Sequence, residues 1–207
     1  MRLRLPRPFL PVPFLAALLA AVFAALPLTG CFLPDRFEAE LSVDASGDMR
    51  FDYKGDLVYL LGALEIAEGR MGKDDAELKR LAKSIGAARG TRDVTRDGPR
   101  YAVELRLRQV LKPGERFAFP PVGLPVFTLA RGEDGTFTLR GVTASQDHLR
   151  ALERLAIRFR GTLTAKLPGK AVDHNGTADR GLFSDAYKWS FNSLRDPPPY
   201  LVTRTGK

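Results

Sequence analysis

The first 31 residues constrain this chain more than any other feature. Arg2, Arg4 and Arg7 lie in a start without acidic residues, and an uncharged apolar stretch follows over residues 9–28. A basic start, an apolar middle and small residues at the end are typical of a secretory signal peptide. The stretch is nearly long enough to span a bilayer, so an uncleaved membrane helix is the alternative. The prolines near both of its ends disfavour that helix.

Cys31 is the single cysteine of the chain. A secreted protein with one cysteine cannot form an internal disulfide, so the thiol is free, intermolecular or modified. The sequence Leu28-Thr29-Gly30-Cys31 resembles the lipobox of bacterial lipoproteins. The resemblance implies cleavage between Gly30 and Cys31, acyl chains such as palmitate on Cys31, and a place in the cell envelope. Phe32 in the next position resembles the default for sorting to the periplasmic face of a Gram-negative outer membrane.

Removal of the predicted signal peptide, residues 1–30, from the 207-residue chain leaves 177 residues, enough for one well-cored domain. It also removes three arginines and no acids, which lowers the net charge from +8 to +5. This moderate excess fits attraction to anionic lipid or glycan, and together with export it argues against nucleic acid as a partner. We expect a lipidated cysteine with a short tether over residues 31–36 and a single domain over residues 37–207.

Alternating apolar and polar residues predict a β-hairpin over residues 37–53, turning at Ser46-Gly47-Asp48. Helical spacing then predicts one helix over residues 57–68 with Asp56 as its cap, and a second that starts with Asp74 and Glu77 as a capping box. The later chain predicts further short strands and a helix over residues 146–155. The expected fold class is α+β, a mainly antiparallel sheet of about nine short strands with two helices after the first hairpin and one short late helix.

Two pairs of arginines are candidate ligand-binding residues. Arg106 and Arg108 share one strand face, and Arg158 and Arg160 share another, because side chains two apart point the same way. If the two strands are neighbours, four guanidinium groups converge, and guanidinium matches phosphate in bidentate geometry. Such a cluster would suit an anionic lipid or glycolipid. The alternative is a solvated charged face.

Two apolar segments, a late aromatic strand and a proline-rich stretch, are candidates for the core. Tyr187, Trp189 and Phe191 share one strand face, which predicts that Trp189 is buried. Prolines forbid a regular central strand over residues 117–127. That apolar stretch either closes over the core, lines a lipid-sized pocket or dips into the membrane interface.

Local sequence motifs that would indicate an enzyme are missing, although the scattered members of a Ser/His/Asp triad leave no such motif, and an enzyme is the third hypothesis. A nucleophile elbow, a P-loop and a dinucleotide fingerprint are missing, and His148 and His174 lie outside any ligand-spaced cluster. A hairpin turn explains the candidate calcium loop of Asp44, Ser46, Asp48 and Asp52 better than calcium binding does. We therefore expect no catalytic residues, no metal and no cofactor.

Three features together resemble the LppM-type lipoprotein domain: the lipobox, the immediate hairpin around Ser46-Gly47-Asp48, and Asn175-Gly176 followed by Lys188-Trp189. The resemblance implies an α+β domain in which a sheet and helices enclose a hydrophobic cavity, and binding of envelope glycolipids. Members often add a C-terminal membrane helix, whereas this sequence has a polar tail, so we expect the N-terminal anchor alone. The leading hypothesis is a non-enzymatic lipoprotein that binds a lipid or amphiphilic envelope component. The alternative is a structural or assembly lipoprotein that binds another envelope protein.

Overall fold

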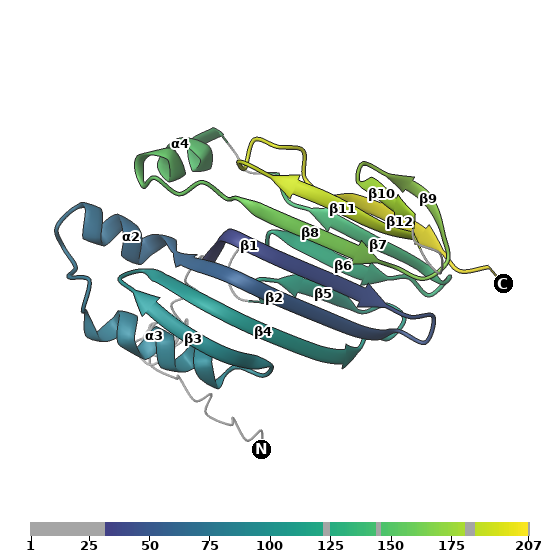
Figure 1. The fold of residues 1–207 in the computed structure, drawn as a ribbon, viewed down its shortest axis with the longest axis horizontal. Helices are drawn as coiled ribbons and strands as arrows, with labels where there is room; N and C mark the ends of the chain where they lie inside the picture. Colours follow the sequence, from purple (N-terminus) through teal and green to yellow (C-terminus); the bar gives the residue numbers. More distant parts are fainter. Residues whose placement is uncertain (1–31, 122–124, 144–145, 181–184, 207) are drawn as a thin grey trace, which may run out of the picture.

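The computed structural model describes residues 32–121, 125–143, 146–180 and 185–206. The predicted signal peptide, Gly30 and Cys31 lie outside these residues. The described residues form an α+β fold of twelve strands and three helices, with the strands in two sheets that face each other (Figure 1). There are thus more strands than the nine or so expected. Within this part of the chain β1 and β8 form the one parallel pair, and all other pairs are antiparallel.

The larger sheet, called sheet A, has seven strands in the order β10-β11-β8-β1-β2-β4-β3. Its strands are β1 (Phe32–Val43), β2 (Asp48–Tyr59), β3 (Thr91–Asp97), β4 (Arg100–Val110), β8 (Gly161–Lys166), β10 (Thr177–Arg180) and β11 (Asp185–Phe191). Sheet B has five strands in the order β5-β6-β7-β12-β9. They are β5 (Arg116–Phe119), β6 (Phe127–Arg131), β7 (Thr136–Gly141), β9 (Lys170–His174) and β12 (Tyr200–Arg204). The helices are α2 (Leu60–Ala67), α3 (Ala76–Ala87) and α4 (Gln146–Arg154).

Strand β1 starts at Phe32, so the five residues 32–36 belong to the sheet and the tether prediction was wrong for them. Phe32 pairs with Tyr59 of β2. Asp35 is buried, and its carboxylate accepts a hydrogen bond from Arg100 Nη1 at 2.9 Å. A register shift between Asp35 and Glu38 marks a β-bulge, and Arg36 has a φ of 50°. The bulge breaks the alternation of side chains, which is why this piece of strand resembles a loop in the sequence.

The helix boundaries also differ from the prediction. Asp56 is not a helix cap: it lies in β2, and its carboxylate accepts hydrogen bonds from Arg36 and Arg100. Helix α2 begins only at Leu60. Helix α3 is capped by Asp75, whose carboxylate accepts from the Glu77 N–H at 2.8 Å, one residue later than predicted.

The two sheets share one aromatic core. Phe51 of β2 is fully buried, and its ring centroid lies 5.3 Å from that of Phe117 and 4.8 Å from that of Phe119. The described part of the proline-rich stretch therefore closes over the core, as the first of the three alternatives proposed; residues 122–124 lie outside the described residues. The predicted burial of Trp189 is confirmed, and its Nε1 donates to Asn175 Oδ1 at 2.8 Å.

Arg131 of β6 ties sheet B to the first hairpin of sheet A. Its Nη1 donates to the carbonyl oxygens of Ser46 and Leu111, at 2.7 and 2.8 Å. In the same hairpin, Asp44 Oδ1 accepts from the Ser46 N–H and hydroxyl and from the Asp48 N–H, as expected of a turn. The Ser46 hydroxyl bond is the main cause of a lowered pKa at Asp44.

Candidate functional site

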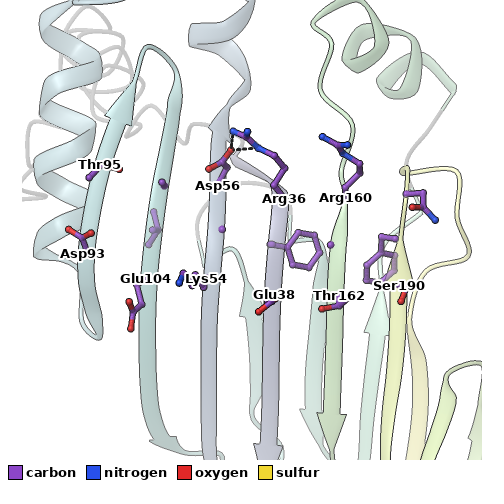
Figure 2. Close-up of a pocket in the computed structure, with 17 residues that line it drawn as sticks. Arg36, Glu38, Lys54, Asp56, Asp93, Thr95, Glu104, Arg160, Thr162 and Ser190 are labelled. Atoms are coloured by element: carbon purple, nitrogen blue, oxygen red, sulfur yellow. Dashed lines mark hydrogen bonds and ion pairs between the residues drawn. The ribbon is translucent and has the colours of Figure 1, made fainter.

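A groove of about 970 Å³ crosses the outer face of sheet A, the face turned away from sheet B (Figure 2). It extends over strands β3, β4, β2, β1, β8 and β11. Its wall side chains are mostly charged or hydroxyl-bearing, and those labelled in Figure 2 are Arg36, Glu38, Lys54, Asp56, Asp93, Thr95, Glu104, Arg160, Thr162 and Ser190. The groove is thus a polar, open surface.

The floor of the groove is Phe37 between two glycines on the flanking strands. A Cβ on Gly55 of β2 would lie 2.5 Å from Phe37 Cβ, and one on Gly161 of β8 would lie 2.4 Å from the Phe37 carbonyl oxygen. Only glycine allows the backbones to approach Phe37 this closely. Because neither glycine carries a side chain, the face is hollow here.

A network of two carboxylates and two arginines holds one end of the groove. Asp35 and Asp56 are both buried, and Arg100 Nη1 lies 2.9 Å from Asp35 Oδ2 and 3.5 Å from Asp56 Oδ2. Arg36 Nε donates to Asp56 Oδ2 at 3.0 Å, and this hydrogen bond is the main cause of the raised pKa of Arg36. Buried carboxylates require such partners. The network therefore fixes the bulge and the position of the Arg36 guanidinium.

Arg160 and Lys54 supply the remaining positive charges. Figure 2 shows the Arg160 guanidinium at the same end of the groove as that of Arg36. Lys54 pairs in register with Glu38 on β1 and with Glu104 on β4. Neither Arg160 nor Lys54 forms a side-chain ion pair with any other residue in the described part of the chain. Both charges are thus available to a ligand.

The structure does not bring the four predicted arginines together. In sheet A, β1 and β2 lie between β4 and β8, so the condition for a cluster of four arginines, that the two strands are neighbours, is not met. Three strand spacings of about 4.8 Å separate β4 from β8 by roughly 14 Å. Arg158 and Arg160 precede β8, which starts at Gly161, and Arg160 alone of the four lines the groove.

The other predicted arginines have different surroundings. Arg106 on β4 contacts Glu104, with Nη2 3.3 Å from Oε1, and its Nε lies 3.9 Å from Asp52 Oδ1. Arg108 is exposed farther along the same strand, opposite Arg50. Alternation correctly predicts which face a side chain takes, but it holds no information about strand order.

The groove residues that the sequence did not single out are chiefly Arg36, Lys54 and Glu104. Lys54 and Glu104 have the outward positions of alternating strands, so the signal was present but looked like an ordinary solvated face. Arg36 had no such signal, because the bulge that orients it breaks the alternation.

The space between the sheets is filled at the position where the groove floor lies. A void lined by Phe37, Phe119, Phe127, Leu163 and their neighbours has a volume of about 10 Å³. That is room for about one water molecule and not for an acyl chain. Around these residues the aromatic core leaves no room for a hydrophobic cavity of the kind that the family resemblance implies.

Neither a metal cluster nor a spanning helix is found in the described residues. No three or more of their His, Cys, Asp and Glu side chains gather closely enough to hold a metal ion. Of the helices described, none has the length and apolar character needed to cross a membrane.

Comparisons with known proteins give one structural likeness. The chain is similar to the folded domain of the LppM protein of Mycobacterium tuberculosis, solved by NMR, with a TM-score of 0.42 and 10% sequence identity. The match covers 86% of this chain and 94% of that chain. No family model and no curated protein matches the sequence.

Proposed function

We propose that this protein is a lipid-anchored envelope protein whose domain binds the polar head of an anionic amphiphile in the groove on sheet A, without catalysing a reaction. The observation that carries the proposal is the position of the groove beside the predicted anchor. Strand β1 begins at Phe32, so no flexible spacer follows Cys31. Five residues of extended chain reach at most about 18 Å, which keeps Arg36 within that distance of the anchored residue.

The polar groups of the groove are complementary to a headgroup that carries both phosphate and hydroxyls. The Arg160 and Arg36 guanidinium groups suit a phosphate at the end of the groove nearer the anchor. Farther along, the Glu38 and Glu104 carboxylates and the Thr162 hydroxyl can accept hydrogen bonds from ligand hydroxyls. The acyl chains of such a ligand can stay in the membrane, so no internal cavity is needed.

The competing proposal is an assembly lipoprotein that binds another envelope protein through a sheet edge. Strand β9 lies at an edge of sheet B, and its Val172 is 60% exposed. An unpaired edge with an apolar side chain can accept a strand from a partner. A stoichiometric protein in pull-downs that is lost in Val172→Lys would favour this alternative.

The anchoring half of the proposal is tested at Cys31. We expect metabolic labelling with a radioactive or clickable fatty acid to mark the wild-type chain, and Cys31→Ser to lose both the label and cleavage by the lipoprotein route. Label retained by Cys31→Ser would overturn the anchor.

The binding half is tested on a chain that starts at residue 32, so that the anchor cannot mask the result. We expect Arg160→Glu to weaken binding to anionic vesicles strongly at low salt. Arg108→Glu is the matched control, because it makes the same charge change on the same face outside the groove lining. Salt should reduce wild-type binding, since exposed charges are screened beyond about 8–10 Å. Equal binding of the two variants would refute the groove as the site.

A further inference from the structure

Helix α2 is an apolar helix that the sheets leave largely uncovered. Its eight residues contain one charged side chain, Glu65, and the glycine at position 62 is the one residue of α2 that is buried. A Cβ at Gly62 would lie 2.6 Å from the Tyr59 ring and 3.0 Å from a methyl group of Leu78. The helix thus packs inward through Gly62, with Leu60, Ala63 and Ile66 half-buried against the core. Leu61 and Leu64 remain each 41% exposed.

The helix leaves sheet A at the same point as the predicted anchor. Phe32, the first residue of β1, pairs with Tyr59, the last residue of β2, and their ring centroids are 5.6 Å apart. The residue before Phe32 is Cys31, and the residue after Tyr59 is Leu60, where α2 begins. Figure 1 shows α2 at the end of sheet A where β1 starts.

We infer that α2 is a membrane-contacting helix, with Leu61 and Leu64 inserted into the acyl layer of the membrane beside the lipidated Cys31. This inference rests on the anchoring half of the proposed function. Exposed apolar side chains beside a lipid anchor strengthen membrane binding by burying apolar area, and a second contact makes a lipid anchor stable. A partner of this kind explains why leucines occupy positions where a soluble surface would carry polar residues.

Two exposed arginines, Arg158 and Arg160, fit the same orientation of the domain, with α2 towards the membrane. Arg158 is exposed and, like Arg160, precedes β8 near the start of β1, where Phe37 pairs with Gly161. Neither arginine has an ion-pair partner among the residues that the structure describes. Basic side chains near a leaflet attract anionic headgroups. A lipid anchor fixes one point only, whereas a second contact through α2 would fix how the groove faces the membrane.

The test uses the full lipidated chain reconstituted into vesicles of phosphatidylethanolamine and phosphatidylglycerol. An environment-sensitive fluorophore is attached to Leu64→Cys, or to Val110→Cys as the matched control. Val110 is 54% exposed and lies at the end of β4 opposite to the one near α2. We expect the probe at position 64 to shift its emission to the blue, to resist iodide and to be quenched by brominated acyl chains. The probe at position 110 should remain quenched by iodide alone.

Equal iodide quenching at the two positions overturns the inference, as does protection of position 64 without quenching by brominated lipid. The second result would mean that another protein surface, such as that of a second copy of the chain, covers the helix. In the Leu61→Asp background we expect the blue shift at position 64 to be lost while circular dichroism stays unchanged. Failure of the anchor itself is read separately, because a free Cys31 would take up the fluorophore in the wild-type chain.

Discussion

The two faces of sheet A differ in what their side chains do, although the same strands supply both. Along β2, Phe51 and Tyr53 point inward and lie fully buried against sheet B, whereas Asp52 and Lys54 point outward. The inner face is a layer of aromatic rings, with the Tyr53 and Phe119 centroids 4.8 Å apart. The outer face is an open groove of charges and hydroxyls. Stability and ligand binding are therefore expected to depend on alternate residues of one strand.

The largest expected effect concerns the inner face at Trp189. Trp189→Ala should lower the free energy of unfolding by about 3–5 kcal/mol, the usual cost of truncating a buried large aromatic. The neighbouring Lys188→Ala, on the outer face of the same strand, should change it by less than about 0.5 kcal/mol. Denaturant titration measures both. A water-exposed fluorescence maximum of folded wild type, or similar costs for the two variants, would contradict the assignment of the faces.

A smaller effect is expected from pH at two buried tyrosines. Burial is the main cause that raises the pKa of Tyr59 and of Tyr101 to about 12. The pKa of each tyrosine is higher in the folded than in the unfolded state. The contribution of the two protonated hydroxyls to the free energy of unfolding is therefore complete below pH 10 and is lost as the pH rises towards 12. Each should lower the free energy of unfolding by about 1 kcal/mol between pH 9 and pH 11.

Thermal or denaturant unfolding across this pH range provides the measurement. The same steps with Tyr101→Phe should show a shallower loss, because the variant has one titrating group fewer. If the free energy of unfolding falls with pH equally steeply in wild type and variant, burial of Tyr101 does not cause the loss of stability at alkaline pH.

The smallest effect on stability is expected on the outer face. Lys54→Ala should change the free energy of unfolding by less than about 0.5 kcal/mol, as is usual for an exposed side chain without an ion pair. The same substitution should weaken vesicle binding, since Lys54 lines the groove and has no ion-pair partner among the described residues. Vesicle sedimentation and denaturant titration on the same sample check the two halves. A destabilised Lys54→Ala variant with unchanged vesicle binding would contradict the assignment of binding to the outer face and stability to the inner face.

Local pattern predicted much of the inner face. The first hairpin, the turn at Ser46-Gly47-Asp48 and the burial of Trp189 all follow from alternation and turn chemistry within a few residues. The α+β class follows from the sum of such elements. The residues that form the core are thus largely readable from the sequence.

The groove was not predictable by the same means, because it depends on contacts between distant parts of the chain. Strand β1 pairs in parallel with β8, and the Asp35 carboxylate accepts from the Arg160 N–H, 125 residues away. That pairing places β1 and β2 between the strands that carry the two pairs of arginines. The bulge at Arg36 also hid a groove residue, since it interrupts the periodicity on which the prediction depends.

Backbone amide shifts during titration with a short-chain anionic phospholipid, below its micelle concentration, test the central claim most directly. If the groove binds the headgroup, the largest shifts should fall on outward residues such as Glu38, Lys54 and Thr162, and Arg160→Glu should abolish them. Inward residues of the same strands should shift little. Shifts concentrated around Phe119 and Phe127 would place the ligand between the sheets, and that result, or no shift at all, would contradict the proposed groove site.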